Sequence, residues 1–292
     1  MLLSPFLVFG LLGFPEVGLA GAALAAMIAN TFGMIMNTRV LFTGGSRLHL
    51  RLSEYRFDPH MLWQIAKVGG PAAVNGAERS IAQIILVGLV TPFGDAALAA
   101  FTLTRRVEMF ANLGSQGMGQ AAGIIVGQNL GAGKPQRARK TVLWAVGYVA
   151  IVKTAFALFV FFFPEVLLSL FTREAEFRDL ASQWVRIQAF GYLAMGISQV
   201  AMQSFMTAGD TLFPMLVTLA TIWGVQQPLA YILPDVGGMG QLGIAWAVTI
   251  AMLSRLLFYV PYFFYGRWLR VKVFSAAPAK QALQSEPVGG GS

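Results

Sequence analysis

Five charged or amide side chains recur at intervals of three or four residues within one apolar segment: Arg105, Glu108, Asn112, Gln116 and Gln120. This spacing places them on one face of an α-helix. In a membrane, such groups either bond across helices, for about 1 kcal/mol each, or face a wet cavity. The pattern therefore predicts a polar stripe that joins two helices or lines a path through a membrane protein.

A second apolar segment carries a stripe of uncharged polar groups: Gln188, Tyr192, Gln199 and Gln203. Amides and a phenol suit loose binding of varied amphipathic cations better than one tight ligand site would. Met195 and Met202 lie nearby, and methionine adapts to ligands of different shape. Ordinary helix packing is the other reading of the same stripe, so these residues are candidates for lining a cavity.

Glu78 lies inside a third apolar segment, with Asn75 one turn before it and Arg79 beside it. Burial favours the neutral form of a carboxyl group, so a buried Glu78 could exchange protons near neutral pH. The alternative is a structural ion pair with Arg79. Because acidic residues inside membranes are usually functional, Glu78 and Asn75 are the candidate ion-coupling residues.

Lys153 is the remaining charged candidate. It lies near the middle of another apolar segment, where a lysine needs a partner or water. Pairing with Glu78 or Glu108 is expected, and a place on a cavity wall is a further possibility.

The elements that must carry these residues are membrane-length helices. The sequence is 56% hydrophobic and only 12% charged, about half the charged fraction of an average soluble domain. Seven apolar stretches are long enough to cross about 30 Å of hydrocarbon at about 1.5 Å per residue. They cover residues 18–42, 61–90, 95–129, 141–163, 180–208, 212–233 and 240–266, whereas the stretch 1–12 is too short. The predicted fold is an all-α integral membrane protein with about seven full transmembrane helices.

The charged loops predict the orientation. Basic residues follow the first, third and seventh stretches, and acidic residues dominate the other side. By the positive-inside rule, the basic loops and the C-terminus lie in the cytoplasm, and a bacterial inner membrane is the expected location. The net charge of +8 sits in short loops, so membrane lipid and not nucleic acid is the expected charged partner.

Several enzyme classes lack their required residues. The sequence has no Cys, and His49 and His60 have no ligand spacing with acids or with each other. The glycines at 127–133 end a predicted helix and lack the phosphate-loop pattern. We therefore predict no catalytic residue, no metal site and no organic cofactor.

An internal similarity suggests two repeated lobes. Aligning Gly18 with Gly240 pairs Gly21 with Gly243 and several alanines that follow. Equivalent points are 222 positions apart (240 minus 18), so a complete lobe would need about that length, and an N-terminal lobe is predicted to be missing. Small-residue packing motifs common to membrane helices are the alternative explanation.

The motif Gly127–Ala138, GQNLGAGKPQRA, resembles the multidrug and toxic-compound extrusion (MATE) family, supported by Gly18–Ala29, Gly69-Gly70-Pro71 and Gly209-Asp210-Thr211 with Pro214. The resemblance implies a twelve-helix, two-lobe transporter, of which this chain holds the end of helix five and helices six to twelve. Residues 1–42 would end the N-terminal lobe, 43–60 would link the lobes, 61–272 would form the six-helix C-terminal lobe, and 273–292 would be a disordered cytoplasmic tail.

The same resemblance implies an antiporter that exports small cationic amphipathic compounds in exchange for protons or sodium. Sodium-coupled members carry an acidic residue where this sequence has Gly196, so proton coupling, or coupling in the missing lobe, is favoured. Two alternatives stay open: a flippase for lipid-linked oligosaccharides, which would need a more cationic cavity, and a non-transporting orphan membrane lobe.

Overall fold

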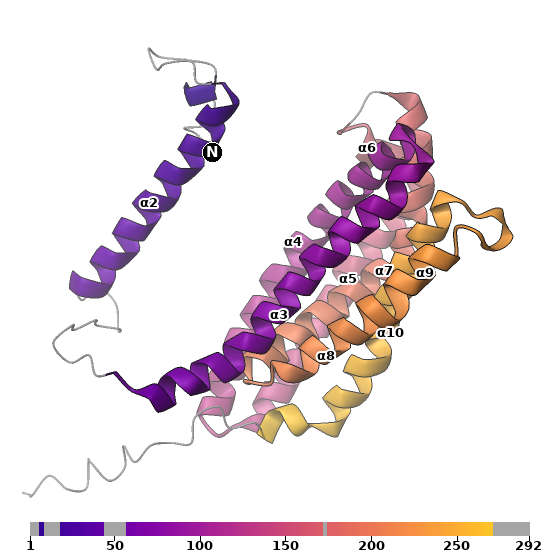
Figure 1. Cartoon of the computed structure of the whole chain (residues 1–292). Coiled ribbons are helices and arrows are strands. Elements are labelled where there is room, and N and C mark those ends of the chain that lie inside the picture. The colour runs from indigo at the N-terminus through magenta and orange to yellow at the C-terminus, as the bar shows by residue number, and fades with distance from the viewer. Residues whose placement is uncertain (1–5, 9–17, 44–56, 172–173, 271–292) are drawn as a thin grey trace, which may run out of the picture. The chain divides into compact units, whose positions relative to one another are not determined.

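The computed structural model describes residues 6–8, 18–43, 57–171 and 174–270, and every regular element within them is a helix (Figure 1). The chain divides into two compact units, Met1–Pro59 and His60–Ser292. The predicted tail 273–292, most of the predicted linker and His49 lie outside the described residues. The two units are considered separately.

The first unit contains α2, Leu19–Thr43, close to the predicted stretch 18–42. Gly18 precedes the helix with φ 57°, a left-handed conformation that glycine adopts without strain. The Gly21 N–H donates to the Gly18 carbonyl at 3.0 Å. A Cβ on Gly21 would lie 2.6 Å from the backbone carbon of Leu7, so this position has no room for a side chain.

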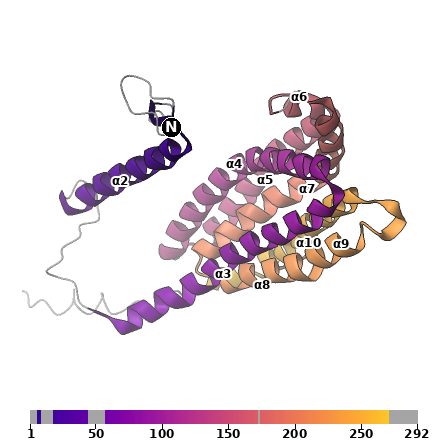
Figure 2. The same cartoon turned by 45° about the horizontal axis from the view of Figure 1, so that its top comes forward.

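The second unit has six membrane-length segments among its described residues, and they run side by side (Figure 1, Figure 2). They are α3 (Pro59–Val90), α4 (Asp95–Gly131), α5 (Pro135–Phe162), α7 (Ala175–Thr207), α8 with α9 (Leu212–Thr221 and Gln227–Ile232) and α10 (Gln241–Tyr265), and a short α6 (Pro164–Leu168) follows α5. Each matches a predicted stretch. The helix α5 begins six residues before its prediction because Pro135 fits the first turn of a helix.

Four of these segments are long and apolar enough to cross a membrane: Pro59–Phe93, Pro135–Phe162, Leu212–Ile232 and Gln241–Tyr265. The helices α4 and α7 are longer than most of these, at 37 and 33 residues, but carry the two polar stripes and are too polar to meet that criterion. Their length supports the predicted spans, and the rest of the fold must shelter their polar groups.

Among the described residues, α4 and α7 share the most extensive helix–helix contact, and Gly119, Gly123 and Gly127 of α4 lie against α7 along it. A Cβ on Gly123 would lie 2.6 Å from Thr207 Oγ1, and one on Gly119 would lie 3.2 Å from Gln203 Cγ. Glycine at every fourth position lets two helix backbones approach closely. We call this contact the α4–α7 seam.

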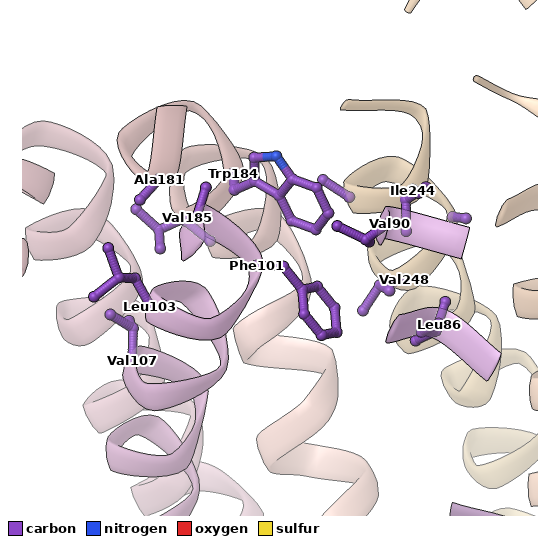
Figure 3. Close-up of a cluster of buried hydrophobic side chains, with 14 of the residues drawn as sticks. Leu86, Val90, Phe101, Leu103, Val107, Ala181, Trp184, Val185, Ile244 and Val248 are labelled. Atoms are coloured by element: carbon purple, nitrogen blue, oxygen red, sulfur yellow. The ribbon is translucent and has the colours of Figure 1, made fainter. Parts of the chain in front are cut away.

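Two clusters of buried side chains fill the bundle. In the first, Trp184 of α7 meets Phe101 of α4 edge-on, with ring centroids 5.7 Å apart, beside Val90 of α3 and Ile244 of α10 (Figure 3). The second is centred on Phe205 of α7, whose ring contacts Phe213, Tyr259, Tyr262 and Trp268. These clusters fix α7 between its neighbours at two levels.

A single turn of π-helix, Ile222–Gln226, joins α8 to α9, and Pro228 follows it. The wider turn keeps Ile222 and Gln226 buried, and Gln227 Nε2 donates to the Ala82 carbonyl of α3 at 3.1 Å. Such turns are frequent at functional sites.

The start of α10 has the same backbone geometry as the start of α2. Gly240 has φ 53°, and the Gly243 N–H donates to its carbonyl at 3.1 Å. A Cβ on Gly243 would lie 2.6 Å from backbone atoms of Leu233 and Pro234. The two glycine pairs aligned from the sequence thus share a positive φ at the first glycine and a hydrogen bond from the second, and the repeated lobes stay a prediction.

Candidate functional site

The second unit contains a partly open cavity of about 170 Å³, and its wall includes residues of both buried clusters. The helices α3, α4, α7 and α10 and the π-helical turn all contribute to its wall. Its polar lining residues are Arg79, Gln83, Arg105, Glu108, Asn112, Ser198, Gln199, Gln226, Arg255 and Tyr259. Leu86, Met195, Met202, Ile222, Val248 and Met252 supply the apolar part. We call this space the arginine cavity.

The first predicted stripe divides along α4. Arg105, Glu108 and Asn112 line the arginine cavity, whereas Gln116 and Gln120 are exposed and do not. The division falls where the α4–α7 seam begins, because the close approach of the two helices there leaves no internal space. The transport role of all five side chains stays a prediction.

The second stripe divides as well. Gln199 lines the arginine cavity, and Gln203 packs against Gly119 in the seam. Gln188 and Tyr192 are fully buried away from the cavity, and neither side chain has a hydrogen-bond partner among the described residues. The ring of Tyr192 instead contacts Phe156 of α5, with centroids 5.8 Å apart.

Three arginines and one glutamate give the arginine cavity its charge. Glu108 Oε2 accepts from Arg105 Nη1 at 2.5 Å, the one ion pair found in the described part of the chain. Arg79 donates to Met202 Sδ at 3.4 Å, a weak acceptor, and Arg255 Nε is buried without a partner among described residues. Three positive charges minus one negative charge leave a formal excess of two.

Sequence reasoning missed two of these arginines as site residues. Arg79 was considered only as a neighbour of Glu78, and Arg255 was not considered at all. The sequence does contain a signal for Arg255, because this arginine lies inside the apolar stretch 240–266. Ionisable residues within membrane helices usually face a cavity or a partner.

The candidate coupling residues lie outside the arginine cavity. Glu78 is 5% exposed, and both its carboxylate oxygens lack a partner among described residues. The ion pair with Arg79 that was considered from the sequence is not formed. Asn75, one turn earlier, donates to Thr218 Oγ1 at 2.9 Å and to the Pro214 carbonyl at 3.3 Å, which ties α3 to α8.

Lys153 is also separate from the arginine cavity. It is buried, its Nζ donates to the Ala111 carbonyl of α4, and it borders a second pocket of about 200 Å³ between α4 and α5. Neither predicted partner, Glu78 or Glu108, forms an ion pair with it within the described ranges. A backbone carbonyl satisfies the ammonium group instead, a contact that residue types cannot reveal.

Gly196 of α7 packs directly on the aliphatic part of Lys153. A Cβ at this position would lie 2.7 Å from Lys153 Cγ and 2.8 Å from Val149 Cγ1. An acidic side chain here would therefore require α5 or α7 to move. Within the described ranges, no group of three or more His, Cys, Asp or Glu is arranged to bind a metal ion.

Comparison with known proteins places these features in a family. The family model described as MatE matches residues 71–232, more than half of the chain. Among curated proteins, the probable multidrug resistance protein YoeA of Bacillus subtilis is 26% identical over 269 residues, which cover 89% of this chain and 57% of YoeA. The chain thus spans a little over half the length of this relative.

Solved structures share the fold. An outward-facing multidrug resistance MATE family transporter of the MOP superfamily matches with a TM-score of 0.81 at 20% identity, over 91% of this chain and 58% of that one. A MOP superfamily transporter from Pyrococcus furiosus matches with a TM-score of 0.82 at 19% identity, over 93% and 60%. The predicted all-α, multi-pass membrane fold is confirmed.

Proposed function

The chain belongs to the MatE family, whose members are membrane transporters and not enzymes, and on that premise we propose that it forms the C-terminal lobe of an ion-coupled exporter. Residues 61–272 would be this lobe and residues 1–42 the end of a preceding one, joined by 43–60. The length of the relatives supports a second lobe, because the chain covers only 57% of YoeA.

The arginine cavity is the observation that carries the proposal. Charged and amide groups are expensive to hold within membrane-length helices unless they face water or a ligand. Here they surround internal space beside methionine and aliphatic side chains, a combination that suits an amphipathic organic molecule. The description of YoeA as a probable multidrug resistance protein supports substrates of this kind.

Glu78 is the proposed coupling group. Its carboxylate is buried without a partner among described residues, and proton uptake and release is the simplest chemistry available to it. Protonation would change which arrangement of the two lobes is favoured. Sodium coupling in this lobe has less support, since the packing of Gly196 on Lys153 leaves no space for a second carboxylate.

The basic loops and the C-terminus are proposed to face the cytoplasm of a bacterial cell, with the chain in the inner membrane. The cluster Lys134–Lys140, which begins α5, and Arg267 and Arg270 after α10 support this orientation through the positive-inside rule.

Replacing Glu78 with glutamine tests the coupling role. In inverted membrane vesicles from cells that express the protein, Glu78→Gln is expected to abolish proton-driven substrate uptake, because an amide cannot exchange a proton. Protein amount and membrane insertion should not change, since the amide nearly preserves the shape of the carboxyl group.

The matched control is Glu165→Gln in α6, where the side chain is exposed, and its uptake should equal that of the unchanged protein. Undiminished proton-driven uptake by Glu78→Gln would contradict the assignment. Absence of any driven uptake in the unchanged protein would favour the non-transporting lobe.

The charge of the arginine cavity favours a second candidate. A flippase for lipid-linked oligosaccharides would need cationic groups for pyrophosphate, and Arg79 and Arg255 have no acidic partner among described residues. The export of cationic compounds implied by the family resemblance stays a prediction, but it has less support from these two side chains.

A further inference from the structure

We propose that the arginine cavity binds an amphipathic anion whose phosphate or carboxylate head is held by Arg79 and Arg255. The inference deepens the proposed transport function by naming the substrate class. Binding itself depends only on the cavity, all of whose lining residues belong to the unit His60–Ser292.

The first argument is the unbalanced charge. Arg105 is neutralised by Glu108 at 2.5 Å, whereas Arg79 of α3 and Arg255 of α10 have no acidic partner among described residues. Both guanidinium groups line one cavity and repel each other there. Arg79 is exposed and Arg255 is half-buried, so burial removes water mainly from Arg255. An anion that enters between them supplies the missing charge.

The second argument is the chemistry of the donors. Guanidinium presents a planar fork of N–H groups that fits the paired oxygens of phosphate and carboxylate. Arg79 currently bonds only a methionine sulfur, at 3.4 Å, and the Nε of Arg255 has no acceptor among described residues. Because sulfur is a weak acceptor, the Arg79 guanidinium stays available to a ligand. Arg255 also lines the cavity, and Gln226 and Tyr259 in the same wall offer neutral hydrogen bonds to the head group.

The third argument concerns the rest of the ligand. The apolar part of the wall includes Leu86, Met195, Ile222, Val248 and Met252, so a purely hydrophilic anion would leave apolar surface uncovered. A volume of about 170 Å³ suits a compact aromatic or branched aliphatic body. A cation of the same shape would meet an excess of positive charge and is expected to be rejected.

Three probes with one body and different heads test this inference: 1-naphthyl phosphate, 1-naphthol and protonated 1-naphthylmethylamine. Titration of the purified 292-residue chain, followed by naphthyl fluorescence, should give a Kd for the phosphate about tenfold lower than for the alcohol, as charge-assisted hydrogen bonds predict. The ammonium probe should bind most weakly.

Arginine variants identify the side chains responsible. Arg79→Gln and Arg255→Gln should each weaken binding of naphthyl phosphate by about tenfold and leave the affinity for 1-naphthol nearly unchanged. Arg79→Lys should retain part of the preference for phosphate, because it keeps the charge but loses the fork. Arg106→Gln is the matched control, since Arg106 is exposed and lies outside the cavity wall.

The outcomes are distinct. Equal affinity for the three heads, tighter binding of the ammonium probe, or an equal effect of Arg106→Gln would overturn the inference. If the chain prefers the phosphate probe but shows no ion-driven transport, the proposed function is wrong and the inference about anion binding stands. Competition by phosphatidic acid in phosphatidylcholine nanodiscs would identify the anion as a lipid head group, and binding undiminished by that lipid would identify it as a soluble compound.

Discussion

Gly243→Val is expected to prevent the chain from folding. A Cβ at position 243 would lie 2.6 Å from the backbone carbon of Leu233 and from the nitrogen of Pro234. Added atoms in a packed core typically destabilise by about 1–3 kcal/mol, and the effect should be larger here because backbone atoms cannot rotate away. The end of α9 and the start of α10 would have to separate, which would also displace Val248, Met252 and Arg255 from the cavity wall.

The measurement is the fraction of protein that elutes as a single monodisperse peak after extraction from membranes, followed over a temperature ramp. Gly88→Val in α3 is the matched control, because a Cβ at position 88 would meet nothing within 4 Å and valine has the same helix propensity at both sites. A Gly243→Val protein as thermally stable as Gly88→Val would show that the contact is not as close as described.

Gly123→Leu is expected to have the next largest effect. Its Cβ would lie 2.6 Å from Thr207 Oγ1 and 3.3 Å from the Gln203 carbonyl oxygen, so leucine would force α4 and α7 apart. Thr207 can change rotamer, but the carbonyl cannot, and we expect a loss of about 3 kcal/mol or more in the free energy of unfolding.

Gly117→Leu on the same helix provides the comparison, since a Cβ there meets nothing within 4 Å. The denaturation midpoint of Gly123→Leu should fall well below that of Gly117→Leu, which should stay close to that of the unchanged chain. Equal midpoints would mean that α4 and α7 do not depend on glycine for their approach. Because Glu108 and Gln199 reach the cavity from these two helices, folded Gly123→Leu protein should also bind naphthyl phosphate less selectively.

The helices were predictable because a membrane span needs a fixed length of apolar sequence. Glycine and proline at the ends, such as Gly94 before α4 and Pro135 at the start of α5, define where each stretch begins. The regular 3.6-residue period also identified the polar face of α4. These properties are local, so each predicted stretch of the second unit appears as a helix, although α5 begins at Pro135 and not at residue 141.

The site was only partly predictable, since periodicity shows which residues share a face but not what that face meets. Asn112 and Gln116 belong to one stripe, yet Asn112 lines the cavity and Gln116 is exposed. The difference depends on where α7 packs against the glycines of α4, and this tertiary contact cannot be read from the sequence of α4. Likewise, Lys153 donates to a backbone carbonyl, which the sequence does not reveal. Arg79 and Arg255 line the same cavity although their helices are far apart in the sequence.

The polarity of α4 and α7 bears on how the chain enters the bilayer during synthesis. Both helices are less hydrophobic on average than α3 and α5, so their own hydropathy favours partition into lipid less strongly. Part of the free energy that retains α4 must then come from its contacts with α5 and α7, and α7 emerges from the ribosome only after α5 and α6. We therefore expect the translocon or an insertase to shelter α4 until α7 arrives, and a nascent chain arrested before α7 should leave α4 more open to extraction from the bilayer.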